Sequence, residues 1–69
     1  MRIWAARDKD GKLMLYFNKK PLKNQDMWYN LTDGDFCETD EDLPSVKWED
    51  EEPTEVYFDE NESHKLKVK

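Results

Sequence analysis

The chain has 69 residues and a formal net charge of −6, with 36% apolar and 41% charged residues. A chain this short forms one domain at most, because folding hides only about 60% of its extended surface. High charge alone favours disorder, but aromatic residues make up 13% of the chain, and each buried ring removes about 150–250 Å² from water. We therefore expect one folded domain over residues 1–69, anchored by aromatic side chains.

Charge along the chain is basic, then acidic, then basic. Residues 1–24 carry a net charge of +5, residues 25–63 carry −14 and residues 64–69 carry +3. Two interpretations remain open. Either the basic ends neutralise the acidic middle within the fold, or the acidic middle forms a face for a basic partner.

The first residues and the cysteine content indicate the compartment. Cys37 is the single cysteine, so it forms no disulfide within the chain and no cysteine-based metal cage, which is typical of a reducing compartment. Within the first eight residues, only four uncharged residues in a row separate Arg2 from Arg7. A secretory signal needs about 7–15 apolar residues, and a membrane span needs about 18. We expect a cytoplasmic protein with no membrane partner.

The clearest local pattern lies between Ile3 and Phe17. Asp8 and Gly11 occupy the first and fourth positions of a type I turn, and Gly11 can adopt the positive φ that closes a hairpin with a bulge. The loop Lys9 to Gly11 then predicts these opposed pairs: Arg7 and Leu13, Ala6 and Met14, Ala5 and Leu15, Trp4 and Tyr16, Ile3 and Phe17. Both faces are apolar, so either the sheet curls around a core or a second element covers it.

A second hairpin is predicted at Asp33-Gly34, which separates two runs that contain aromatic residues. Its register stays open. A two-residue loop pairs Leu31 with Phe36, whereas a three-residue loop pairs Asn30 with Phe36.

Connections are expected elsewhere in the middle of the chain. Residues 18–24 are polar and basic and contain Pro21, which cannot donate to a strand ladder. Residues 40–45 predict a turn or a short 3₁₀ piece, because Pro44 prevents a long helix. Residues 46–48 predict a short extended stretch, in which Val46 and Trp48 alternate with Lys47.

The last hairpin is predicted to join residues 55–58 to residues 64–68 across the polar residues 59–63. Leu66 and Val68 face inward with His64, while the intervening lysines face outward, as in a protected edge strand. Residues 64–69 form this edge strand or a frayed tail.

These elements together predict an all-β fold. We expect a small antiparallel meander of about five to six short strands, in a curled sheet or a partly open barrel. The core is predicted to consist of Trp4, Leu15, Tyr16, Trp28, Trp48, Val56 and Phe58.

Side chains suited to catalysis are few. His64 is the single histidine and lies in the basic tail, and the acids around Cys37 disfavour a reactive thiolate. A carboxylate pair such as Glu38 and Glu55 suits acid–base chemistry, but with seventeen acids such a pair carries no information. We expect no enzyme activity and no catalytic residue.

Two short segments raise the possibility of a calcium site. Residues 8–11 and 33–35 each place two carboxylates near a glycine, and oxygen ligands suit Ca²⁺. A calcium loop needs a glutamate at its twelfth position, but the twelfth residue counted from Asp8 is Lys19. We therefore expect no metal and no cofactor.

The candidate partner-binding residues are acidic. They are Glu49, Asp50, Glu51, Glu52, Glu55, Asp40, Glu41 and Asp42. Such a run is usually a solvated loop, but spaced acids also imitate phosphates and dock onto a basic groove. The same charge argues against direct binding of nucleic acid, although the aromatic residues with Lys19, Lys20 and Lys23 leave weak stacking on single strands as an alternative.

Three stretches carry a resemblance to other proteins. They are Trp4-Ala5-Ala6-Arg7-Asp8-Lys9-Asp10-Gly11, Leu13 to Phe17 with Lys20-Pro21, and Leu43-Pro44-Ser45-Val46-Lys47-Trp48-Glu49-Asp50-Glu51-Glu52-Pro53-Thr54-Glu55-Val56. Over residues 3–58 the chain resembles a group of short uncharacterised proteins encoded in gut bacterial genomes and in their mobile elements and phages. The resemblance implies a small cytoplasmic accessory protein and supplies no catalytic residue or ligand.

Two functional hypotheses follow. The first is an interaction module, monomeric or weakly dimeric, that binds another protein, basic or nucleic-acid-binding, through the acidic middle and exposed aromatic side chains. The alternative is a phage or mobile-element inhibitor that imitates nucleic acid.

Overall fold

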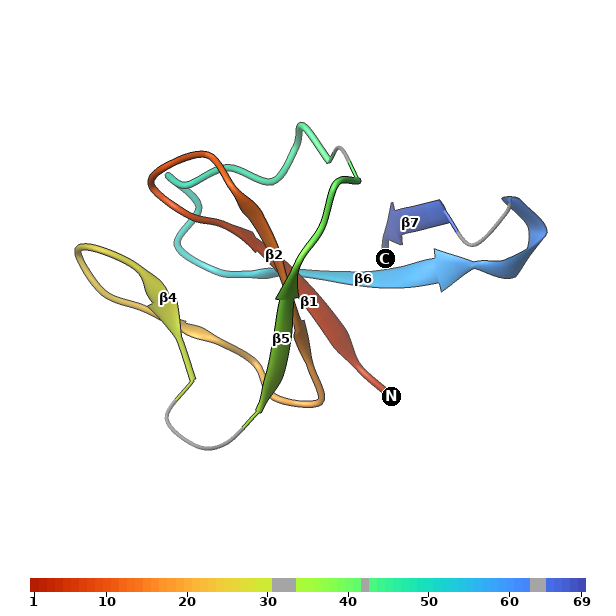
Figure 1. Ribbon diagram of the computed structural model, residues 1–69, viewed down its shortest axis with the longest axis horizontal. Coiled ribbons are helices and arrows are strands. Elements are labelled where there is room, and N and C mark those ends of the chain that lie inside the picture. The colour runs from red at the N-terminus through yellow and green to blue at the C-terminus, as the bar shows by residue number, and fades with distance from the viewer. Residues whose placement is uncertain (31–33, 42, 63–64) are drawn as a thin grey trace.

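The described part of the chain folds into short strands and one 3₁₀ turn. A computed structural model describes all residues except 31–33, 42 and 63–64. The elements are β1 (Ile3–Arg7), β2 (Leu13–Phe17), β3 (Leu22–Lys23), β4 (Trp28–Tyr29), β5 (Asp35–Glu38), β6 (Thr54–Asp59), η1 (Glu60–Glu62) and β7 (Lys65–Val68) (Figure 1). The predicted all-β class is confirmed, and the described residues contain no α-helix.

Five strands form one antiparallel sheet in the order β5-β2-β1-β6-β7, and β3 and β4 form a second, two-stranded sheet. The large sheet stays open, with β5 and β7 at its edges. Its order is not the simple succession of hairpins expected for a meander, because β1 also pairs with β6, and β2 also pairs with β5. The β6–β7 hairpin extends away from the other strands (Figure 1).

The first hairpin has the predicted register, with Ile3 opposite Phe17 and Arg7 opposite Leu13. Gly11 has a φ of 95°, and its N–H donates to the carbonyl of Asp8 at 2.9 Å. The glycine is needed here because residues with a Cβ rarely adopt this positive φ.

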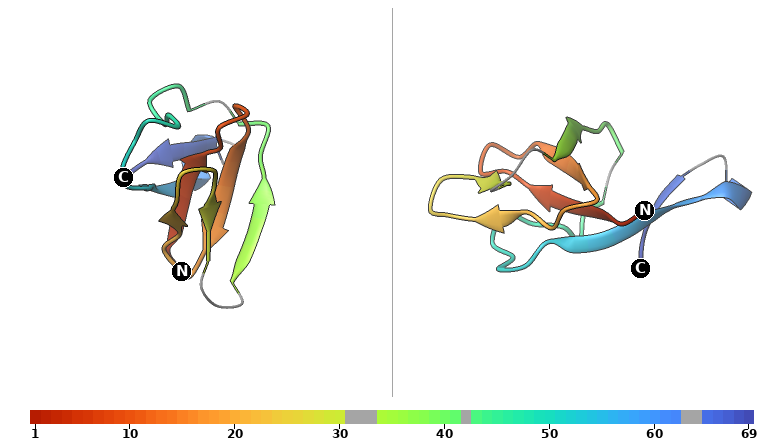
Figure 2. Two further views of the ribbon diagram at one scale, coloured as in Figure 1. Left: turned by 90° about the vertical axis from the view of Figure 1, so that its left-hand side faces the viewer. Right: turned by 90° about the horizontal axis from the view of Figure 1, so that it is seen from below.

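Both faces of the first hairpin are covered, as its apolar pattern predicted. One face belongs to a cluster formed by Ile3, Ala5, Leu13, Leu15, Leu43, Val46, Val56 and Leu66. The other face contributes to a cluster of Ala6, Tyr16 and Trp28, against which Met14 and Trp48 pack. The β3–β4 hairpin lies over this second face (Figure 2).

The predicted hairpin around Asp33-Gly34 is wrong. Trp28 and Tyr29 pair with β3, while Phe36 pairs with Tyr16 of β2, so the register that opposes Asn30 and Phe36 does not occur. Leu31, the partner of Phe36 in the other register, lies outside the described residues. Asp33 itself lies outside the described residues. β4 pairs with β3 and β5 pairs with β2. Turn chemistry alone does not predict these pairings.

The segment 18–24 contains a strand where only a connection was expected. β3 pairs with β4 through Leu22↔Tyr29 and Lys23↔Trp28. The turn between them is held by Asn24, whose side-chain oxygen accepts the N–H groups of Asp26 and Met27 at 2.7 and 2.8 Å. Two residues of pairing are enough because Trp28 anchors the hairpin in the core.

Turns occupy the segment before β6. The N–H of Val46 donates to the carbonyl of Leu43 at 2.9 Å, which fits the turn predicted for residues 40–45, although Asp42 lies outside the described residues. The extended stretch predicted for residues 46–48 is wrong, because the N–H of Asp50 donates to the carbonyl of Lys47 and closes a second turn.

The last hairpin is confirmed, with Phe58 opposite Leu66 and Val56 opposite Val68, and β7 is an edge strand. Leu66 is buried, but Val68 and Phe58 are 44% and 40% exposed, so their predicted inward position is wrong. β1 pairs only with Thr54 to Val56 of β6. Phe58 therefore lies beyond the end of β1, and among the described strands it pairs with β7 alone.

The remaining core predictions mostly hold. Trp4, Leu15, Tyr16, Trp28 and Val56 are buried, and Trp48 is partly buried. His64, expected beside Leu66, lies outside the described residues.

Candidate functional site

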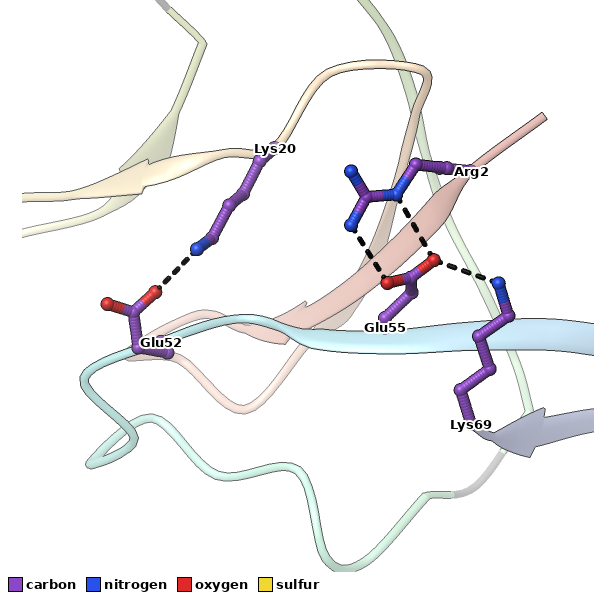
Figure 3. A network of polar contacts seen from close by, with 5 residues as sticks. All are labelled: Arg2, Lys20, Glu52, Glu55 and Lys69. Carbon is purple, nitrogen blue, oxygen red and sulfur yellow. Dashed lines mark hydrogen bonds and ion pairs between the residues drawn. The ribbon is translucent and has the colours of Figure 1, made fainter.

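Glu55, one of the candidate partner-binding acids, joins the two ends of the chain. Its Oε1 lies 3.0 Å from Arg2 Nη2, and its Oε2 accepts from Arg2 Nε at 3.3 Å and from Lys69 Nζ at 3.0 Å (Figure 3). Hydrogen bonds from Arg2 first, and then from Lys69, lower the pKa of Glu55 to about 2. This carboxylate is engaged within the fold.

We call residues Glu49–Glu52 the acidic run. Two of its side chains also have partners within the fold. Glu52 pairs with Lys20 at 2.9 Å (Figure 3), and Asp50 Oδ2 accepts the N–H of Lys47 at 3.1 Å. Glu49 and Glu51 are exposed and have no partner in the part of the chain that the structure describes. The acidic run thus presents fewer free charges than its sequence suggests.

The other predicted acids follow β5. Asp40 is exposed, the backbone N–H of Glu41 donates to Thr39 Oγ1 at 3.1 Å, and Asp42 lies outside the described residues. They share the long connection from β5 to β6 with the acidic run, but buried Leu43 and Val46 separate the two groups along it. The ion pairs found support the interpretation in which basic ends neutralise the acidic middle.

Lys23 lies between two tryptophan rings. Its Nζ is 4.2 Å from the centre of the Trp48 ring and 5.6 Å from that of Trp28. It donates to the carbonyl of Trp48 and, at 2.9 Å, to that of Asp50. Cation–π attraction and these two hydrogen bonds hold the β3–β4 hairpin against the turn formed by residues 47–50. Lys23 and Lys20, considered above for binding single strands, therefore both have internal partners.

A cavity of about 310 Å³ opens between β2, β5 and the β3–β4 hairpin. Its lining includes four aromatic rings and two polar residues: Tyr16, Trp28, Tyr29, Phe36, Asp8 and Asn30. Its volume lies at the lower end of the range for ligand pockets. Aromatic walls with a few polar groups are the composition typical of such sites.

Phe36 and Met27 form the exposed rim of this cavity. Phe36 is 61% exposed and Met27 is 51% exposed. The Phe36 ring stacks on Tyr16 with 5.9 Å between the ring centres. This contact fixes the inner side of the Phe36 ring and leaves the outer side open to a partner.

Three buried polar atoms belong to the residues that line this cavity. Asp8 Oδ1 and both polar side-chain atoms of Asn30 are buried without a hydrogen-bond partner among the described residues. Burial, and then Asp10, raise the pKa of Asp8. Burial and the nearby Asp8 raise the pKa of Tyr16 to about 12. An unpartnered buried polar group costs about 1–3 kcal/mol, so a ligand that satisfies one gains affinity.

A second depression, of about 490 Å³, also has Asp8 in its wall and includes Arg7 and Trp48. The Arg7 guanidinium in its wall donates to the carbonyls of Val46, Gly11 and Leu43 at 2.8, 2.8 and 3.1 Å. The Arg7 guanidinium is therefore occupied, and the lining of this depression includes one aromatic residue, Trp48, against four in the cavity beside β5. We regard the cavity beside β5 as the better candidate site.

Sequence reasoning missed this cavity. Exposed aromatic side chains were expected in general, but Phe36, Tyr29 and Met27 were not singled out, because the pairing partner assigned to their strands was wrong. A hint was present in β5 itself: Asp35-Phe36-Cys37-Glu38 has no lysine, unlike the other edge strand.

Comparisons with protein-family models, curated proteins and solved structures gave no match for this chain. Within the described residues, no three His, Cys, Asp or Glu side chains are grouped to hold a metal ion. The same residues include no helix with the length and apolar character needed to cross a membrane.

Proposed function

We propose that this chain is a non-enzymatic interaction module that binds another protein at the β5 surface. We define the β5 surface as strand β5 together with Met27 and Tyr29 at the rim of the adjoining cavity. The observation that carries this proposal is Phe36, a residue that is 61% exposed beside an aromatic cavity. Exposed aromatic side chains next to a pocket are typical anchors of protein interfaces.

The position of β5 in the sheet supports the same proposal. An edge strand presents unpaired N–H and C=O groups that can pair with a further strand. At the opposite edge, β7 carries Lys65, Lys67 and Lys69 in or next to the strand, which discourage such pairing. β5 has Phe36 and Cys37 at its centre and is the less protected edge.

The alternative remains an acidic inhibitor that imitates nucleic acid. Glu49 and Glu51 are exposed and have no partner among the described residues, which favours it. Against it, Glu52 and Glu55 already neutralise basic residues of the same chain. A phosphate mimic needs its charges free, so we favour the β5 surface.

Affinity purification from a bacterial lysate, chosen because of the resemblance to gut bacterial proteins, tests the proposal. The bait is the wild-type chain, the Phe36→Ser variant, or a matched control that carries Glu49→Gln and Glu51→Gln. We expect a specific partner at low and high salt that is lost with Phe36→Ser and kept with the acidic control, because apolar contacts depend little on salt.

Other outcomes would count against the module. Recovery of nucleic-acid-binding proteins at low salt only, abolished in the acidic control, would favour mimicry. A partner retained by all baits would show that neither surface is used. Saturable turnover of a substrate, lost on Cys37→Ser or His64→Ala, would contradict the absence of enzyme activity.

A further inference from the structure

We infer that the β5 surface receives an extended segment of the partner protein, which pairs with β5 and places an arginine or lysine side chain in the adjoining cavity. This inference rests on the proposed function. It adds the conformation of the bound segment and the chemistry of the side chain that the cavity accepts.

A second copy of this chain is a poor occupant. If β5 paired antiparallel with the β5 of another copy about its centre, Asp35 would lie opposite Glu38 of that copy, and this would occur at both ends. Like charges directly opposite each other destabilise strand pairing, and each chain has a net charge of −6. Glu38 also pairs with Lys12 at 3.9 Å within the chain, so Asp35 is the acid of β5 that is available to attract a basic residue of a partner segment.

The alternation of β5 determines which side chains of an added strand meet the cavity. Phe36 pairs with Tyr16 and Glu38 pairs with Met14, and both β2 residues line the cavity. Side chains at the same level on neighbouring strands point to the same face. A residue that pairs with Phe36 therefore directs its side chain to the cavity side of the sheet.

The chemistry of the cavity favours a cation. Asp8 forms no ion pair in the described part of the chain, and its Oδ1 and the Asn30 side-chain oxygen are buried without donors. A guanidinium or ammonium group in the cavity stabilises the Asp8 carboxylate even without direct contact, because Coulomb attraction acts over several ångströms where water is excluded. The apolar stem of arginine or lysine can lie along Phe36, Tyr29 and Met27.

The same molecule already contains a cation bound in this manner. Lys23 Nζ lies over the rings of Trp48 and Trp28 and donates to two carbonyl oxygens. The cavity beside β5 offers a comparable set, with the rings of Tyr29 and Phe36 and the unpartnered oxygens of Asp8 and Asn30. In the part of the chain that the structure describes, no cationic side chain donates a hydrogen bond to Asp8 Oδ1 or to the Asn30 side-chain oxygen.

Peptide titration of the full-length, ¹⁵N-labelled chain tests the inference. The probe is a short acetylated peptide of alternating threonine and arginine, and the matched probe has glutamine in place of arginine. We expect amide shifts at Phe36, Cys37 and Glu38 and a shift of the Trp28 indole N–H. The arginine peptide should bind about tenfold more tightly, since charge-assisted hydrogen bonds are roughly twice as strong as neutral ones.

Variants distinguish recognition of arginine in the cavity from general attraction by the negative charge of the chain. Asp8→Asn keeps the size of the side chain and one oxygen acceptor but removes the charge, and it should remove most of the preference for arginine over glutamine. Tyr29→Leu keeps apolar contact but lacks the ring, and should also weaken arginine binding more than glutamine binding. Glu49→Gln, at an exposed residue outside the cavity, should leave the preference unchanged.

The outcomes distinguish this inference from the proposed function. Equal binding of both peptides at β5, or equal losses in Asp8→Asn and Glu49→Gln, would overturn the cationic side chain and leave the module intact. Shifts at β5 that grow with protein concentration without peptide, or displacement of the arginine peptide by single-stranded oligothymidine, would overturn the assigned occupant. Absence of shifts at β5 with both peptides would overturn the inference, and the purification with Phe36→Ser then judges the module separately.

Discussion

Lys23 Nζ lies 4.2 Å from the centre of the Trp48 ring and donates to the backbone carbonyls of Trp48 and Asp50. These contacts join the β3–β4 hairpin, which forms one wall of the cavity, to the turn before β6. The Lys23 ammonium is therefore part of the structure that positions the β5 surface.

Replacing Lys23 tests this link. Lys23→Met retains the apolar stem but loses the charge and both hydrogen bonds, and we expect it to lower the free energy of unfolding by about 1–3 kcal/mol. Denaturant unfolding followed by tryptophan fluorescence measures the change. Lys47→Met, at an exposed lysine, should have little effect, and equal stability of the two variants would show that the Lys23 contacts do not contribute.

Arg7 is expected to be as important as Lys23, although it lies at the end of β1. Its guanidinium donates to three backbone carbonyls, of Val46, Gly11 and Leu43, and lysine cannot reproduce this fork. Arg7→Lys should lower stability by about 1.5–3 kcal/mol, measured as a lower melting temperature. Lys9→Gln, at an exposed residue in the neighbouring turn, is the control, and a melting temperature of Arg7→Lys equal to that of this control would contradict the role of the guanidinium.

Glu55 should make stability depend on pH under acidic conditions. Its pKa falls from 4.5 to about 2 in the folded chain, so the folded state favours the ionised form. That contribution is fully present above pH 4.5 and is lost as the pH falls from about 4.5 through about 2. Glu55→Gln should flatten this part of the curve of unfolding free energy against pH, whereas Glu51→Gln should retain the wild-type slope. A slope unaffected by Glu55→Gln would contradict the ion pairs with Arg2 and Lys69.

Phe58 and Leu66 face each other across the last hairpin but differ in burial. Leu66 is 2% exposed and Phe58 is 40% exposed, so Leu66→Ala should cost about 2–5 kcal/mol. Phe58→Ala should cost less than about 1 kcal/mol, because much of its ring remains in water in the folded state. Thermal unfolding of both variants measures the difference, and a larger loss for Phe58→Ala would contradict the exposed position of its side chain.

Local patterns predicted the first hairpin completely, and non-local pairing explains the errors that followed. The turn from Asp8 to Gly11 and its flanking strands are adjacent in sequence, so turn chemistry determines their register. Phe36 instead pairs with Tyr16, and no local rule identifies a partner that far away. Phe58 was predicted in the core because it alternates with Val56 along the same face of its strand. That alternation does not show that the pairing of β6 with β1 stops at Val56.

The candidate site was only partly predictable for a similar reason. Composition identified the acids, but Glu55 is joined to Arg2, 53 residues away, and this reduces the charge available to a partner. The cavity beside β5 combines Asp8, Tyr16, Tyr29 and Phe36 from four separate segments. Each of these residues is unremarkable in sequence, and only the sheet order brings them together.

Amide hydrogen exchange of the chain, alone and bound to the partner recovered by affinity purification, tests the central claim most directly. The account predicts that the partner slows exchange at the amides of β5, which lie at the sheet edge, and leaves β7 unchanged. Protection confined to the acidic residues Glu49–Glu52, with unchanged exchange in β5, would contradict the β5 surface as the binding site.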